Sequence, residues 1–169
     1  MRKLAMIAAT ALTIGGLGTS ALTSAQASAP PAPARKAMHC TVVLKKPRPG
    51  QASSPVVSQT CGDTKKDLRA LDDTLLITLY QHADYGGASL EVKGQDGPCD
   101  KAGYKFPVVP WPWFEMVSSF RATNDCHWTS AWSEFNFGGG TDGWYAQNVP
   151  YVGIFLNDNF RSFTIRGLP

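Results

Sequence analysis

The sequence predicts an all-β protein in which two related halves form a two-sheet sandwich. A motif of aromatic residue, four residues, aromatic residue, one residue and glycine occurs over residues 80–87 and again over 132–139. A Ser-Phe step follows each copy, at 119–120 and 162–163. Residues 74–80 alternate, with Leu75, Ile77 and Leu79 on one face. Such a repeat sets the architecture, because each half can bury the apolar face of the other.

The first 27 residues have the pattern of an export signal. Arg2 and Lys3 precede an apolar segment, and Ala25-Gln26-Ala27 provides a small-x-small cleavage site. We therefore expect a secreted monomer that is not stably inserted in a membrane, with residues 28–38 as a disordered Pro/Ala tether. Removing two basic residues lowers the formal charge from +3 to +1, which gives little support for nucleic-acid binding.

An even number of cysteines follows the expected signal. In an exported chain four cysteines indicate two disulfides with three pairings, of which we favour sequence neighbours, Cys40–Cys61 and Cys99–Cys126. A zinc site is disfavoured because the chain has no Cys-x-x-Cys and its three histidines lack ligand spacing.

Residues 39–73 are expected to extend the main domain, which spans residues 74–169. Two β-branched runs, 40–44 and 55–61, flank a Pro/Gly loop and predict a hairpin closed by its own disulfide. Residues 63–73 are the one helix candidate, and a turn is the alternative.

The repeated hairpin with its later serine resembles the βγ-crystallin Greek-key domain. It is most similar to exported bacterial members, a group that includes inhibitors of the Streptomyces metalloproteinase-inhibitor type and killer-toxin-like proteins. The resemblance covers residues 74–169 and implies two Greek-key motifs. It says less about function, because one fold serves many roles.

The resemblance also implies calcium ligands of the pattern (Asn/Asp)-(Asn/Asp)-x-x-(Ser/Thr)-Ser, with each ion shared between the two halves. Here one site would combine Asp158, next to Asn157, with Ser118. The other would combine Glu115 with Arg161, and a guanidinium repels calcium. We expect at most one calcium ion, no other cofactor, and a Glu115–Arg161 ion pair in place of the second ion. The alternative is that both sites are vestigial.

Two loops are candidate contact surfaces. Residues 107–114 contain three prolines and the large side chains Trp111, Trp113 and Phe114. A stiff aromatic loop loses little entropy on binding, although these rings could instead plug the core. The second candidate is the basic loop of residues 45–50.

No catalytic motif is recognisable in the chain, so we predict that it is not an enzyme. We predict a secreted binding protein, and the resemblance suggests an inhibitor of an extracellular peptidase. The alternatives are a calcium-binding extracellular structural module and a secreted antimicrobial, killer-toxin-like protein.

Overall fold

The computed structural model describes residues 38–63 and 73–168. The chain divides into two units, Met1–Ala34 and Arg35–Pro169, and all described residues belong to the second. The expected signal at 1–27, the tether up to residue 37, and positions 64–72 of the helix candidate lie outside the described residues.

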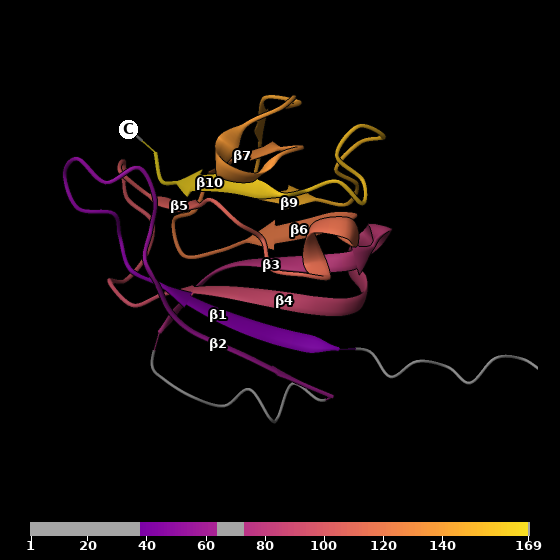
Figure 1. Ribbon diagram of the computed structural model, residues 1–169, viewed down its shortest axis with the longest axis horizontal. Helices are drawn as coiled ribbons and strands as arrows, with labels where there is room; N and C mark the ends of the chain where they lie inside the picture. Colours follow the sequence, from indigo (N-terminus) through magenta and orange to yellow (C-terminus); the bar gives the residue numbers. More distant parts are fainter. Residues whose placement is uncertain (1–37, 64–72, 169) are drawn as a thin grey trace, which may run out of the picture. The chain divides into compact units, whose positions relative to one another are not determined.

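The described residues form two β-sheets that pack face to face (Figure 1). The first sheet has the order β2-β1-β4-β3-β6-β9 and the second the order β5-β10-β7-β8. The strands of the first are β1 (His39–Leu44), β2 (Val56–Gly62), β3 (Thr74–His82), β4 (Gly86–Gly94), β6 (Ser119–Ala122) and β9 (Asn148–Val149). Those of the second are β5 (Tyr104–Phe106), β7 (Trp128–Trp132), β8 (Trp144–Tyr145) and β10 (Ser162–Arg166), and three short 3-10 turns are η2 (Ala83–Tyr85), η3 (Trp113–Glu115) and η4 (Phe135–Phe137).

Each half contributes one strand to the sheet formed mainly by the other half, and this joins the two halves. Strands β3, β4 and β6 of the first half lie in the first sheet, whereas its third strand, β5, pairs with β10 in the second sheet. The second half mirrors this arrangement, because β7, β8 and β10 lie in the second sheet and β9 pairs with β6 in the first. This topology confirms the predicted sandwich of two Greek-key motifs.

The repeated motif folds in the same way in both halves. The aromatic rings five residues apart meet edge to face, with centroids 5.8 Å apart for Tyr80 and Tyr85 and 5.5 Å apart for Trp132 and Phe137. The second aromatic residue of each pair has a left-handed backbone, with φ of 66° at Tyr85 and 63° at Phe137. Because a left-handed conformation is costly for such residues, both turns depend on the surrounding contacts.

The later serine of each half supplies such contacts. The hydroxyl of Ser119 donates to the carbonyl of His82 at 2.6 Å and accepts from the N–H of Tyr85 at 3.1 Å. The hydroxyl of Ser162 donates to Glu134 at 2.7 Å and accepts from Phe137 at 3.0 Å. Each buried serine therefore ties the end of its half to the folded hairpin at the start.

The core lies between the two sheets. Its largest fully buried side chains are Trp113, Tyr104, Phe120, Phe160, Phe163, Leu44, Leu76, Ile77, Leu79, Leu90, Leu156 and Ile165. The alternation expected for residues 74–80 is interrupted by a bulge in the pairing of β3 with β4 between Leu75 and Ile77. The extra residue shifts the register locally, so Leu76 and Ile77 are both buried.

The N-terminal hairpin extends the first sheet. Strand β1 pairs with β2 in an antiparallel ladder and with β4 in a parallel one, which places the hairpin at the lower edge of the sheet in Figure 1. The predicted disulfides Cys40–Cys61 and Cys99–Cys126 are both present. Two disulfides are typical of proteins that fold in an oxidising compartment. Among the residues that the structure describes, no helix is long and apolar enough to span a bilayer.

Candidate functional site

The Pro-rich loop that follows β5 is held at two points and exposed between them. Val109 is buried, and its N–H donates to the carbonyl of Arg161 at 2.8 Å. Trp113 is also buried, and its N–H donates to Pro110 at 2.8 Å. Between these anchors Trp111 leaves 75% of its surface in solvent. The structure therefore separates the predicted aromatic residues: Trp113 belongs to the core, whereas Trp111 is available for contact.

Arg161 covers the second part of this loop. Its guanidinium lies 5.4 Å from the ring centroid of Phe114 and 5.6 Å from that of Phe135, and these two rings meet edge to face at 5.3 Å. Its Nε also donates to the side chain of Asn159 at 3.3 Å. This arrangement differs from the expected ion pair with Glu115, because no such pair forms within residues 38–63 and 73–168. The guanidinium instead makes cation–π contacts with the faces of these two rings.

The equivalent position in the first half is occupied by Ser118, and its surroundings are different. The hydroxyl of Ser118 donates to the carbonyl of Gln81 at 2.9 Å. The N–H of Val152 donates to the carbonyl of Ser118 at 2.9 Å, and the N–H of Asp158 donates to that of Val117 at 3.1 Å. The fold thus brings the backbone of Asp158 beside the residue that precedes Ser118.

Ser118 and Asp158 both carry side-chain oxygen atoms, and the hydroxyl of Ser118 lies beside the carbonyl of Gln81. Asp158 has a left-handed backbone with φ of 56°, and its carboxylate accepts a hydrogen bond from the amide of Asn157 at 2.7 Å. A hydroxyl, a carboxylate and backbone carbonyls are the donor types that calcium prefers. In the described part of the chain, no three His, Cys, Asp or Glu side chains gather in a way that could hold a metal. A metal at Ser118 would therefore depend on hydroxyl and carbonyl oxygens as well as on Asp158.

A groove that the sequence did not predict lies between two loops far apart in the chain. Its volume is about 480 Å³, and it is lined by residues 46–51 and by Asp100, Ala102 and Lys105. The loop of residues 45–50 and Lys105, which begins the loop up to Phe114, belonged to the candidate contact loops, but Asp100 and Ala102 did not. No sequence signal could have joined them, because the pairing of β1 with β4 decides which loops meet.

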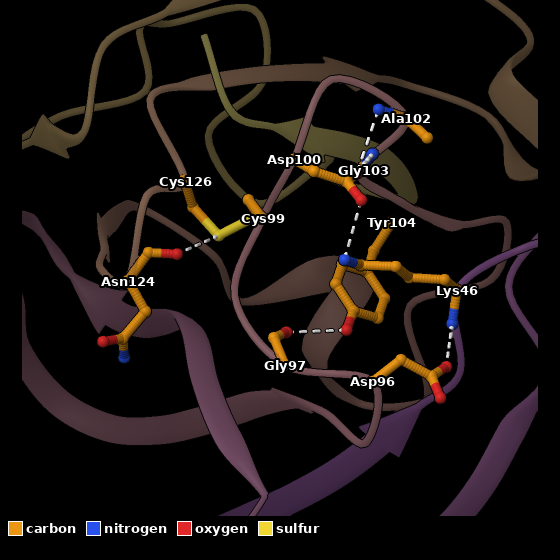
Figure 2. A network of polar contacts seen from close by, with 10 residues as sticks. All are labelled: Lys46, Asp96, Gly97, Cys99, Asp100, Ala102, Gly103, Tyr104, Asn124 and Cys126. Atoms are coloured by element: carbon orange, nitrogen blue, oxygen red, sulfur yellow. Dashed lines mark hydrogen bonds and ion pairs between the residues drawn. A yellow bond between two sulfur atoms is a disulfide. The ribbon is translucent and has the colours of Figure 1, made fainter.

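Lys46 holds one wall of this groove in place (Figure 2). Its ammonium lies 2.8 Å from the carboxylate of Asp100, and its backbone N–H donates to Asp96 at 2.7 Å. The ammonium also lies 5.8 Å from the ring centroid of Tyr104. The hydrogen bond from Lys46, aided by that from the N–H of Gly103, keeps the pKa of Asp100 below its ordinary value.

Backbone contacts fix the rest of the groove. The N–H of Ser54 donates to the carbonyl of Lys105 at 2.8 Å, and the hydroxyl of Ser54 accepts from the N–H of Lys105 at 3.0 Å. The hydroxyl of Tyr104 donates a hydrogen bond to the carbonyl of Gly97 at 2.8 Å. Burial raises the pKa of Tyr104 to about 12. A carbon side chain at Gly94 would collide with the Tyr104 hydroxyl, so only glycine allows this close approach.

Comparison with known proteins finds solved structures that are similar to about half of this chain. One is a double mutant of clostrillin in complex with nickel, with a TM-score of 0.43 and 22% identity over 56% of this chain and 100% of that one. Another is a βγ-crystallin domain from Clostridium beijerinckii, with a TM-score of 0.41 and 22% identity over 54% of this chain and 97% of that one. A double mutant of that domain gives a TM-score of 0.42 and 24% identity over 55% and 98% of the two chains. No family model matches the chain, and no curated protein matches it.

Proposed function

We propose that this protein is a secreted, non-enzymatic binding protein and that the Pro-rich loop of residues 107–114 inhibits an extracellular peptidase. The observation that carries the proposal is the exposure of Trp111 between the buried anchors Val109 and Trp113. A large ring on a loop that is already ordered can bind with little loss of entropy. Interfaces commonly depend on one such central aromatic side chain.

The basic loop of residues 45–50 is less suited to lie in a peptidase cleft as a substrate does. A substrate-like segment needs an extended backbone whose amide and carbonyl groups can bond the enzyme. In this loop the N–H of Arg48 donates to the side chain of Gln51 at 2.8 Å, and the carbonyl of Arg48 accepts from the N–H of Gln51 at 2.9 Å. Both backbone groups are already used in a tight turn.

Incubation of the purified protein with metallo-, serine and cysteine peptidases, with and without calcium, tests the proposal. We expect inhibition of at least one class. In Trp111→Ala the inhibition constant should rise about 30-fold or more, the loss expected for a central aromatic anchor. Trp144→Ala is the matched control, because Trp144 is 50% exposed but lies in β8. Absence of inhibition across the panel would overturn the proposal, and an equal effect of the two substitutions would remove the role of the loop.

A calcium-stabilised structural module is the second candidate function. The observation that favours it is the hydrogen bond from the N–H of Asp158 to the carbonyl of Val117, next to Ser118, whose hydroxyl bonds the carbonyl of Gln81. Calcium bound to the folded state should raise the melting temperature as its concentration rises. We expect this rise to persist in Arg161→Ala and to vanish in Asp158→Ala, and calorimetry to give at most one ion per chain. Two equivalent ions would contradict the role of Arg161.

An antimicrobial role remains the third prediction. No contact in the described residues favours it over the first two, and a growth assay with the purified protein tests it directly.

A further inference from the structure

Positive charge is concentrated around the groove. Residues 45–51 and 96–105 contain five Lys or Arg and two Asp, a formal charge of +3. The other described residues contain four Lys or Arg and nine Asp or Glu, a formal charge of −5. Three of those four cations are arginines that lie over aromatic rings, namely Arg121, Arg161 and Arg166. Within the described part of the chain, the groove is therefore the region that attracts an anionic group most strongly.

Two cations of the groove wall are free to bind a ligand. Lys46 is neutralised by Asp100, as Figure 2 shows. In contrast, the side chains of Arg48 and Lys105 form no ion pair or hydrogen bond within residues 38–63 and 73–168. The turn with Gln51 fixes the backbone of Arg48, and Ser54 fixes that of Lys105. Both charges are thus attached to ordered backbone, on the two separate segments that line the groove.

We propose that this groove binds a short acidic peptide segment of a protein partner, with two neighbouring carboxylates. The planar guanidinium of Arg48 can hold one carboxylate through two parallel hydrogen bonds. Lys105 attracts the second carboxylate as a point charge. Pro47, Pro49 and Ala102 line the same groove and offer apolar surface to the methylene groups of glutamate side chains.

The size and the charge distribution favour a short segment over a long polyanion. A volume of about 480 Å³ is in the range of small-ligand sites and accommodates only a few residues. A nucleic acid or a long acidic glycan would extend beyond the groove, and the other described residues, with a formal charge of −5, disfavour it. The site does not depend on peptidase inhibition, because Arg48 and Trp111 lie on different loops.

Titration of the ¹⁵N-labelled protein with a capped peptide that carries two adjacent glutamates tests the proposal. We expect saturable amide shifts at Arg48, Gly50 and Gln51 and at residues 101–105, which weaken when salt is raised. Arg48→Ala should weaken binding about tenfold or more, and Lys105→Ala should weaken it by up to about fivefold. Arg48→Lys should recover only part of the loss, because an ammonium cannot form the paired hydrogen bonds.

Three further measurements define the outcome. The peptide with glutamines in place of glutamates should cause no saturable shift. Lys93→Ala, which removes a cation of β4 outside the groove lining, should leave the affinity unchanged. Equal binding of the glutamine peptide, or absence of shifts with the glutamate peptide, would overturn the proposal. A heparin-derived oligosaccharide that shifts these amides when the peptide does not would assign the groove to a glycan and also overturn it.

Discussion

Each half of the domain has a serine that makes the same hydrogen bonds, whereas the residue before this serine differs between the halves. Ser119 and Ser162 make the same pair of hydrogen bonds to their folded hairpins. The preceding residue is Ser118 in one half, where its hydroxyl bonds a carbonyl of β3. In the other half it is Arg161, whose guanidinium lies over two aromatic rings.

This difference extends to the loops that pack on these residues. In the first half Glu115 lies in the 3-10 turn η3, and its N–H donates to Pro112. In the second half the equivalent residue, Asp158, has a left-handed backbone and its N–H reaches Val117 in the other half. The serine that closes the hairpin makes the same contacts in both halves. The residue before it is a hydroxyl side chain in one half and a cation over two aromatic rings in the other.

The largest expected effect concerns the buried residues that anchor the two loops. Trp113 and Leu156 occupy equivalent positions, five residues before Ser118 and Arg161. Trp113→Ala should lower the free energy of unfolding by about 3–5 kcal/mol, and Leu156→Ala by about 2–5 kcal/mol, as measured by urea denaturation. Trp113→Phe is the control and should cost less, because the buried indole N–H has no hydrogen-bond partner among the described residues. A loss below about 1 kcal/mol in Trp113→Ala would show that this loop is not anchored.

The next largest effect tests whether Ser119 and Ser162 play the same role in the two halves. Ser119→Ala and Ser162→Ala each remove a hydroxyl that bonds one half-buried N–H and one carbonyl, so each should cost about 1–3 kcal/mol. The two losses should be similar and should add in the double mutant, because the serines serve separate hairpins. Markedly unequal losses in thermal or urea unfolding would mean that the halves are not equivalent at these positions.

A smaller effect is expected at the position where the halves differ. Arg161→Met keeps much of the side-chain volume but removes the cation above Phe114 and Phe135, and should cost about 0.5–2 kcal/mol. Arg121→Met, which removes the cation 3.8 Å from the ring centroid of Tyr85, provides the comparison in the first sheet. Greater stability of Arg161→Met than of the unaltered protein would show that the cation is not satisfied by the rings.

The smallest expected effect is a loss of stability in alkali. Burial raises the pKa of Tyr104 to about 12 and also raises that of Tyr145 above its ordinary value. Above about pH 10 these phenols lose their protons in the unfolded state before they do in the folded state. Their contribution to stability is therefore complete below pH 10 and is lost as the pH rises toward 12. The melting temperature should fall over this interval, and less steeply in Tyr104→Phe; an unchanged slope would exclude Tyr104 as a cause.

Much of the fold could be predicted from local patterns. The aromatic and glycine spacing predicted both folded hairpins, the alternation of residues 74–80 predicted β3, and the β-branched runs predicted β1 and β2, because such features depend on residues close together in the chain. The disulfide pairing was favoured correctly from sequence order. The bulge in β3 was missed, since the pairing partner and not the strand itself determines where an extra residue is placed.

The candidate sites depended far more on tertiary structure. The sequence identified Trp111, Trp113 and Phe114 as one aromatic group, but only packing decided that Trp113 fills the core and that Trp111 remains exposed. It suggested that Arg161 would pair with Glu115, whereas the fold placed the guanidinium over two aromatic rings. The groove was not foreseeable, because its walls are more than 50 residues apart and the parallel pairing of β1 with β4 brings them together. The sequence alone determined the local turns and their repetition, and the long-range pairing of strands decided which surfaces a partner can reach.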